Sequence, residues 1–217
     1  RLVVSDVGDA AVADDGQLFV INNAAMADGN TLPARQVGGP MSMLGNPVDI
    51  ILTGTTLRVA EKSNDAILVF TNIFDGPDGD MAPTLATTTS KPESLAQVMP
   101  AMDLMDASDN ALTATAINGI VVSSNPSAAG PTTGQISRYS AVLSSSLGSF
   151  DADMSIESVT IDALGDGAVT FDDVDSAMGG VLIINRLASM RDDDSYTLSQ
   201  DHMIMGANTG LVTPKGV

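Results

Sequence analysis

Two Asp-rich loops carry the residue types that bind hard cations. In the first, Asp162, Asp166 and Asp173 stand at positions 1, 5 and 12 of a twelve-residue calcium-loop pattern, with a glycine at position 6 for the sharp turn. Leu164 stands at position 3, where a carboxylate or amide is expected, and an aspartate replaces the usual bidentate glutamate. The loop therefore predicts either a calcium site or a plain hairpin turn between two strands.

The second Asp-rich loop is DGPDGD, which follows an apolar segment. It holds three carboxylates within six residues, those of Asp75, Asp78 and Asp80. Hard cations take six to eight oxygen ligands, and these carboxylates would supply part of such a set if the loop curled. The alternative is a solvated connection whose Asp side chains accept hydrogen bonds from nearby backbone N–H groups. Ca²⁺ is thus the one cofactor that the sequence indicates.

Apart from these carboxylates, the sequence holds little catalytic machinery. His202 is the only histidine and there is no cysteine, so a Ser-His-Asp triad would depend on His202 and a thiolate nucleophile is excluded. The sequence has no G-x-S-x-G elbow, no P-loop, no G-x-G-x-x-G after a strand and no H-E-x-x-H. It therefore favours a non-catalytic protein over an enzyme.

The charge balance restricts the class of partner. The 27 acidic residues outnumber Lys and Arg, which total nine, and the formal charge is −18. An acidic surface gains nothing from counterion release on a polyanion, so we expect no nucleic-acid partner. No apolar run approaches the roughly 20 residues of a membrane-spanning helix, so we expect no membrane insertion. The acidity, the absence of cysteine and a start at Arg1 rather than Met favour an extracellular or periplasmic, secreted protein.

The elements that position these residues are predicted to be strands. Of the acidic residues, 24 are Asp and only three are Glu, and Asp favours turns over helix interiors. Four segments combine an apolar strand, a polar turn and a second strand: DAAVADDGQLFVINNA from Asp9, VDIILTGTTLRVAEKS from Val48, AMDLMDASDNALTATA from Ala101 and SVTIDALGDGAVTFDD from Ser158. Their period of two predicts hairpins with one buried face. The equivalent residues Ile51, Leu104 and Ile161 are expected in the core.

Further similarities support a repeat. A third strand is predicted from Ala66, Gly119 and Gly180, whereas SLAQVMPAM (94–102) is the one segment that favours a helix. The first two units also share a longer pattern, in which Asn23 and Asn72 lie 49 residues apart and Pro33 and Pro83 lie 50 apart. The segment LGNPVDI at Leu44 returns as LVTPKGV at Leu211, which we interpret as the start of a further unit.

These residues resemble the repeats of NHL-type and related β-propeller proteins. In that family a blade reads L-x-x-P-x-G/D-I, a hairpin, a strand of the type N-x-I-x-V-F and a loop with G-x-x-x-P. The stretch Leu44–Leu85 carries nearly all of this pattern, and the other units match it in the hairpin and third strand. The resemblance implies an all-β fold, a β-propeller-like array of antiparallel blades that is either complete or incomplete; a β-sandwich is the alternative.

The expected organisation is a single domain over residues 1–217. Its units lie near 9–47, 48–100, 101–157 and 158–210, and the next begins at 211. An incomplete blade leaves strand edges unpaired. We therefore expect either that the natural protein continues past Val217 or that a neighbouring subunit covers these edges, through a protein partner or self-assembly.

The expected function is a non-catalytic extracellular module that acts as a binding or structural scaffold, within a larger assembly. The alternative, implied by resemblance, is a calcium-dependent propeller hydrolase of the lactonase or esterase type. Such enzymes hold the metal with Glu, Asn and Asp at the inner ends of strands. Asn22, Asn118 and Asn185 lie near predicted strand ends and are the Asn candidates.

Overall fold

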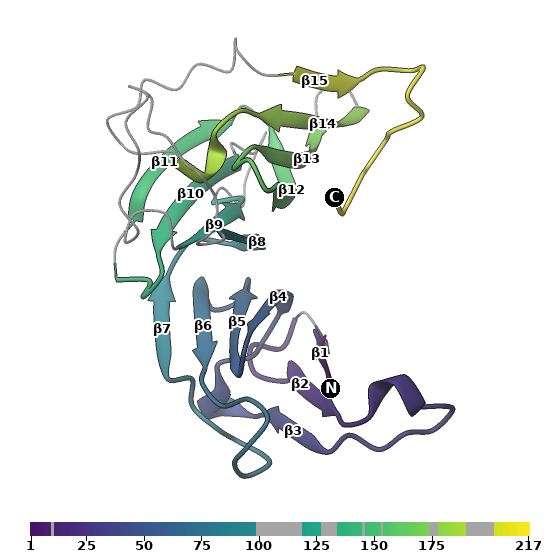
Figure 1. Ribbon diagram of the computed structural model, residues 1–217, viewed down its shortest axis with the longest axis vertical. Helices are drawn as coiled ribbons and strands as arrows, with labels where there is room; N and C mark the ends of the chain where they lie inside the picture. Colours follow the sequence, from purple (N-terminus) through teal and green to yellow (C-terminus); the bar gives the residue numbers. More distant parts are fainter. Residues whose placement is uncertain are drawn as a thin grey trace. The chain divides into compact units, whose positions relative to one another are not determined.

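A computed structural model describes residues 1–9, 11–98, 119–126, 134–144, 146–152, 154–173, 178–189 and 202–217. The chain divides into two compact units, Arg1–Pro92 and Glu93–Val217. Each unit contains two antiparallel sheets whose strands follow one another in chain order (Figure 1). Among the described residues, no helix is long and apolar enough to cross a membrane.

The first unit holds sheets 1 and 2. Sheet 1 consists of β1 (Leu2–Asp6), β2 (Gln17–Ile21) and β3 (Arg35–Gly38). Sheet 2 consists of β4 (Pro47–Thr53), β5 (Thr56–Glu61), β6 (Ala66–Phe70) and β7 (Leu85–Thr88). Two short 3₁₀ helices, η1 (Ala24–Met26) and η2 (Pro40–Ser42), lie in the connections after β2 and β3.

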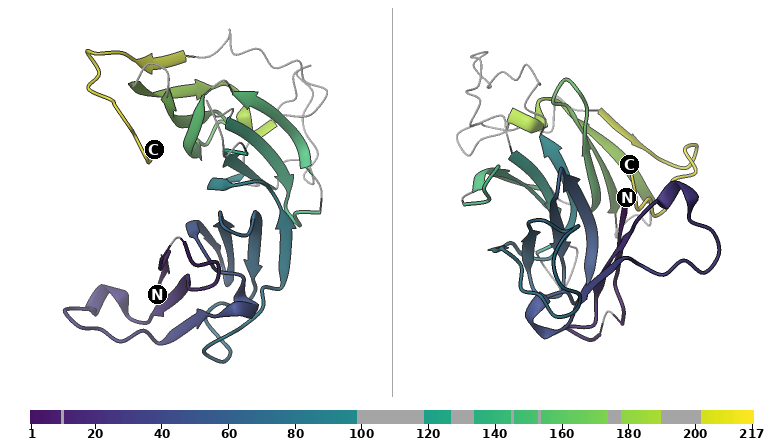
Figure 2. Two further views of the ribbon diagram at one scale, coloured as in Figure 1. Left: turned by 180° about the vertical axis from the view of Figure 1, so that it is seen from behind. Right: turned by 60° about the horizontal axis from the view of Figure 1, so that its bottom comes forward.

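The second unit holds sheets 3 and 4. Sheet 3 consists of β8 (Pro92–Val98), β9 (Gly119–Ser124), β10 (Gly134–Ser140) and β11 (Ser146–Ala152). Sheet 4 consists of β12 (Ser155–Ile161), β13 (Gly167–Asp173), β14 (Met178–Ile184) and β15 (His202–Met205). The 3₁₀ helix η3 (Leu187–Ser189) follows β14. Figure 2 shows the same strands from two other directions.

This arrangement confirms the predicted fold class. The regular structure of the described residues is nearly all β, and its sheets are up-and-down meanders of sequence neighbours, as in a propeller-like array of blades. The predicted helix at 94–102 is wrong over its described part, because Pro92–Val98 is strand β8, hydrogen-bonded to β9. Burial of this strand against the sheet overrides its helical propensity, since Leu95, Ala96 and Val98 are all buried.

The second and fourth predicted hairpins are confirmed as β4–β5 and β12–β13. The first is placed wrongly, because β2 pairs with β1 and not with the residues after Asp9. Those residues form a turn in which Asp15 Oδ2 accepts the Asp9 N–H at 2.9 Å and Asp9 Oδ1 accepts the Ala11 N–H at 3.0 Å. Local Asp hydrogen bonds thus replace a strand. The third hairpin, at Ala101, lies outside the described residues.

Sheets 1 and 2 share one register. Each pair of the β1–β2 ladder has a counterpart in the β5–β6 ladder, and each pair of β2–β3 has one in β6–β7. The turn residues Asn23 and Asn72, which follow β2 and β6, both have a left-handed backbone, with φ of 52° and 54°. Sheet 1 therefore corresponds to the last three strands of sheet 2, and in the described part of the chain it has no counterpart of β4.

Each unit has its own hydrophobic core between its two sheets. In the first unit, Leu18, Val20 and Val37 of sheet 1 pack with residues of sheet 2, and Ile50 of β4 packs against this cluster. The prediction that Ile51 is a core residue is wrong by one position, because neighbouring strand residues point to opposite faces. Ile161 packs against the core of the second unit, as predicted, and Leu104 lies outside the described residues.

Candidate binding face

The outer face of sheet 1 carries apolar side chains that no other sheet in the described part of its unit covers. Leu2 and Val4 of β1 pair with Ile21 and Phe19 of β2, so the four side chains share one face. Leu2 is 47% and Val4 37% exposed, and the two partners are half-buried. We call these four residues, Leu2, Val4, Phe19 and Ile21, the sheet 1 face. Their counterparts in sheet 2, Leu57, Val59, Leu68 and Phe70, are all fully buried.

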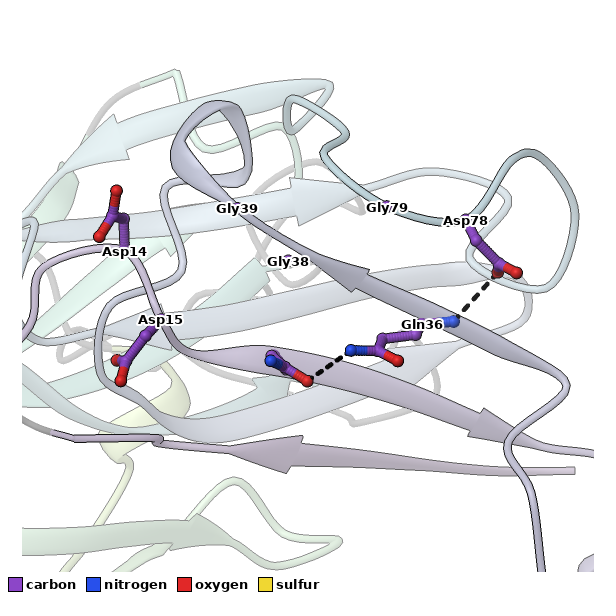
Figure 3. A pocket seen from close by; sticks show the side chains of 8 residues that line it. Asp14, Asp15, Gln36, Gly38, Gly39, Asp78 and Gly79 are labelled. Atoms are coloured by element: carbon purple, nitrogen blue, oxygen red, sulfur yellow. Dashed lines mark hydrogen bonds between the residues drawn. The ribbon is translucent and has the colours of Figure 1, made fainter.

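A polar pocket of about 460 Å³ adjoins this face (Figure 3). Gln36 of β3 pairs with Phe19, and its amide nitrogen donates to Gln17 Oε1 at 2.7 Å. The pocket is lined by Asp14, Asp15, Gln17, Gln36, Gly38, Gly39, Asp78 and Gly79. The lining holds three carboxylates and no Lys or Arg, so it favours cationic groups of a partner.

The loop between β6 and β7 closes the outer edge of β3. The Gly79 N–H donates to Gln36 O at 2.9 Å, and the Gly38 N–H donates to Gly79 O at 3.2 Å. Asp78 Oδ1 accepts the Gln36 N–H at 3.1 Å, as the dashed line in Figure 3 marks. Asp80 Oδ1 accepts the N–H groups of Met41 and Ser42 at 2.7 and 3.0 Å. This loop protects an edge that would otherwise pair with another strand.

Arg35 holds the same loop from the inside. Its side chain is buried, and its guanidinium donates to the backbone carbonyls of Ile73 at 2.6 Å, Asp75 at 2.9 Å and Pro77 at 3.1 Å. A planar guanidinium with five donors suits several carbonyls at once. Asp75 therefore contributes its backbone carbonyl to the folding of the loop, as Asp78 and Asp80 contribute their carboxylates.

The first predicted cation loop is the β12–β13 turn. Asp162 Oδ1 accepts the N–H groups of Leu164 at 2.8 Å and Asp166 at 3.0 Å, and Asp166 Oδ1 accepts the Arg186 N–H at 2.7 Å. Asp173 is the last residue of β13 and lies seven residues beyond Asp166 in the sequence. The structure thus assigns turn-forming contacts to Asp162 and Asp166.

The predicted metal ligands belong to different units. Asp75, Asp78 and Asp80 lie in the first unit, and Asp162, Asp166 and Asp173 in the second. Within the described ranges, no three His, Cys, Asp or Glu side chains are grouped as a metal site would need. Calcium binding stays a prediction.

The other residues considered for catalysis are exposed. His202 lies on the edge strand β15, and Asn22 and Asn185 lie just beyond β2 and β14. Asn118 lies outside the described residues.

Sequence reasoning missed the sheet 1 face. The signal was present, because LVVSD and QLFVI both place apolar residues at alternating positions. We assigned the first strand of the hairpin to the residues after Asp9 instead. The 49-residue offset between the first two units relates β2 to β6, but β1 precedes its counterpart β5 by 55 residues, because the β1–β2 connection is longer than the β5–β6 connection. The offset therefore pointed to the residues after Val7 and not to β1.

Comparison with known proteins assigns this chain to no family. No protein-family model and no curated protein matches the chain. Among solved structures, the crystal structure of BBS1N in complex with ARL6DN, soaked with lead, is similar over 88% of this chain at 12% identity, with a TM-score of 0.44. The chain spans about half, 52%, of the length of that protein.

Proposed function

We propose that this chain is a non-catalytic, extracellular β-propeller-like module that acts as a binding or structural scaffold within a larger assembly. The observation that carries the proposal is the sheet 1 face. Its apolar residues are partly exposed where their counterparts in sheet 2 are buried against a neighbouring sheet. A contiguous apolar patch with a polar rim is typical of a protein-interaction surface.

Energetics support a partner at this face. Full burial of a Val or Leu side chain contributes about 1.5–3 kcal/mol. Leu2 and Val4 gain the rest of that contribution only when another molecule covers them, because they are 47% and 37% exposed. The adjoining carboxylates of Asp14, Asp15 and Asp78 add selectivity for a partner with basic residues beside an apolar centre.

The turn contacts of the acidic residues also support a scaffold over a hydrolase. Asp78, Asp80, Asp162 and Asp166 each accept backbone N–H groups, which is what loop-forming aspartates do. The hydrolase alternative requires at least part of this set to bind calcium instead.

Site-specific photo-crosslinking tests the proposal. A photo-crosslinking residue replaces Val4 in the sheet 1 face, and the matched control replaces Leu164, which is 75% exposed at the tip of the β12–β13 turn. On the surface fraction of the source cells, we expect a discrete protein adduct from position 4 and none from position 164. Equal labelling at both positions, or none, contradicts an interaction face on sheet 1.

A second measurement addresses the enzyme alternative. We expect no hydrolysis of aryl-ester or lactone substrates above the buffer rate, with calcium or with a chelator. Hydrolysis that calcium supports and the chelator abolishes would establish the hydrolase instead.

A further inference from the structure

The connection between β2 and β3 is exposed to solvent along most of its length. It projects away from sheet 1 (Figure 1), and residues 25–34 are all exposed. Met26 is 84% and Leu32 82% exposed, so its large apolar side chains are not packed against the unit. A loop without buried side chains opens and re-forms at little cost in free energy.

An Asp-Gly pair, Asp28–Gly29, lies in this exposed stretch. Gly29 has a φ of 55°, and a Cβ added there would meet no atom within 4 Å. The hydrogen bonds of the pair use its carbonyls, because Asp28 O accepts the Thr31 Oγ1 hydroxyl at 3.0 Å and Gly29 O accepts the Thr31 N–H at 3.0 Å. Among the described residues, the Asp28 carboxylate and the Gly29 N–H bond to no other group.

A carboxyl group and the next peptide nitrogen can react with each other. The glycine nitrogen attacks Cγ of a protonated aspartate, and the new N–Cγ bond closes a five-membered succinimide ring. The amide proton and the carboxyl hydroxyl leave as water. A second water then opens the ring, and when it breaks the bond between the aspartate carbonyl carbon and the nitrogen, the main chain runs through Cγ as isoaspartate. Glycine favours this reaction because no side chain shields its nitrogen.

The sequence contains five Asp-Gly pairs, and hydrogen bonds restrain the other four. In Asp15–Gly16, Asp15 Oδ2 accepts the Asp9 N–H at 2.9 Å, and the glycine is buried. In Asp166–Gly167, Asp166 Oδ1 accepts the Arg186 N–H at 2.7 Å, and the glycine is the first residue of β13. In both pairs the carboxylate is held on the N–H of another residue.

The two pairs of the β6–β7 loop are restrained by sheet 1. Asp78 Oδ1 accepts the Gln36 N–H at 3.1 Å, and the Gly79 N–H donates to Gln36 O at 2.9 Å. In Asp75–Gly76 the aspartate carbonyl accepts from Arg35 at 2.9 Å, and a Cβ at the glycine would lie 3.1 Å from Arg35 Nη2. Ring closure at either pair requires a backbone movement that breaks these contacts.

We propose that Asp28–Gly29 is a site of spontaneous isoaspartate formation in the folded protein, and that it reacts ahead of the other four Asp-Gly pairs. The proposal is independent of the proposed scaffold function. The product keeps one carboxylate but lengthens the main chain by one carbon atom, within a loop that contributes no side chain to the core. The modified loop is thereby a substrate for methyl transfer to the isoaspartate carboxylate.

Isoaspartate mapping of the folded chain provides the test. The chain is aged in mildly acidic buffer and labelled with protein-isoaspartate methyltransferase and a radioactive methyl donor, and tandem mass spectrometry of its peptides locates the label. We expect position 28 to react about tenfold or more faster than any other Asp-Gly pair, a difference of about 1.4 kcal/mol in activation free energy. Endoproteinase Asp-N, which cleaves before aspartate but not before isoaspartate, should progressively lose its cut after Ala27.

Unfolded protein and two variants provide the controls. In concentrated guanidinium chloride the five pairs should react at similar rates, because the contacts that restrain four of them are gone. Asp28→Glu should lose the label at position 28, since the larger ring closes far more slowly. Asp28→Asn should gain label faster, because ammonia leaves more readily than water from the same ring closure. Far-UV circular dichroism verifies that both variants keep their strand content.

Other outcomes overturn the proposal. A folded chain that gains no isoaspartate at position 28, or that gains it equally fast at a second Asp-Gly pair, shows that the described contacts do not select the site. Label that persists at position 28 in Asp28→Glu excludes the succinimide route. Asn118 also precedes a glycine but lies outside the described residues, and its peptide is distinguished by sequence.

Discussion

Sheets 1 and 2 have the same ladder of strand pairs and opposite exposure. In sheet 2, Leu57 and Val59 are fully buried because the face that carries them packs against sheet 1. In sheet 1, the corresponding Leu2 and Val4 face away from the core and are 47% and 37% exposed. Similar residues in the same register thus serve as core in one sheet and as a surface in the other. The difference comes from the neighbouring sheet, because the pattern within each strand is alike.

The largest expected effect is the difference in stability between alanine variants of these two leucines. Leu57→Ala should lower the free energy of unfolding by about 2–5 kcal/mol, because it leaves a cavity in the core of the first unit. Leu2→Ala, at the equivalent register position, should cost about 0.5 kcal/mol or less in the isolated chain. Urea unfolding followed by circular dichroism measures both. Equal losses would mean that the sheet 1 face is covered in solution.

The next effect concerns Arg35, whose counterpart in sheet 2 is Leu85. Arg35→Leu should cost about 1–3 kcal/mol, because the loop carbonyls that Arg35 bonds lose their donor. Leu85→Ala, at the exposed counterpart, should change stability by about 0.5 kcal/mol or less. Limited proteolysis should cut Arg35→Leu within residues 72–81 first. A variant that unfolds like the unmodified chain and resists cleavage there would contradict this role.

Glu61 at the end of β5 and its counterpart Asp6 at the end of β1 provide a third test. Glu61 is buried, and its carboxylate accepts the N–H groups of Asn46 at 2.8 Å, Ser63 at 2.9 Å and Gly45 at 3.1 Å. Glu61→Gln should cost about 1–2 kcal/mol, because an amide NH₂ cannot accept these bonds. Asp6→Asn, on an exposed residue, should be nearly neutral and serves as the control.

The cost of Glu61→Gln should also depend on pH. Burial raises the pKa of Glu61 above its ordinary 4.5, an effect that the backbone hydrogen bonds partly offset. A carboxyl group whose pKa is raised in the folded state stabilises the fold fully at pH values below its ordinary pKa. This stabilisation is lost as the pH rises through the pKa of the folded state. The stability gap between the unmodified chain and Glu61→Gln should therefore narrow above pH 4.5. A gap that widens there would show that the hydrogen bonds outweigh burial.

The smallest effect is expected at Asp65, in the β5–β6 turn. The Lys91 N–H donates to Asp65 Oδ1 at 2.9 Å, and this bond lowers the pKa of Asp65 below its ordinary 3.8. A carboxyl group whose pKa is lowered in the folded state stabilises the fold at pH values above its ordinary pKa. This stabilisation is lost as the pH falls through the pKa of the folded state. Lys91 Nζ also forms an ion pair with Asp65 Oδ1, at 3.1 Å. Asp65→Asn should lower the free energy of unfolding by less than about 1 kcal/mol at neutral pH, because both side chains of this ion pair are partly exposed. The cost should vanish in acid, as unfolding titrations below pH 3.8 would measure.

Sequence alone predicted the fold class, two of the hairpins and the shared pattern of the first two units. These features depend on period-two alternation and on turn residues, which are local signals. The strand β1 was misplaced because ten residues separate it from β2 and an Asp-Gly turn stood nearer. The contacts of Arg35 were not predictable, because they join residues about 40 positions apart and involve carbonyls, which every residue type carries.

The hydrogen bonds of Gly79 to β3 couple the opening of sheet 1 to the opening of sheet 2. The Gly79 and Gly38 amides can exchange with solvent only when the β6–β7 loop leaves the β3 edge, and Arg35 opposes that movement from beneath. A loop that would otherwise fray on its own is thereby bound into a cooperative unit of the fold. The slowest-exchanging loop amides of the first unit should accordingly be those of this connection, with protection close to that of the core strands.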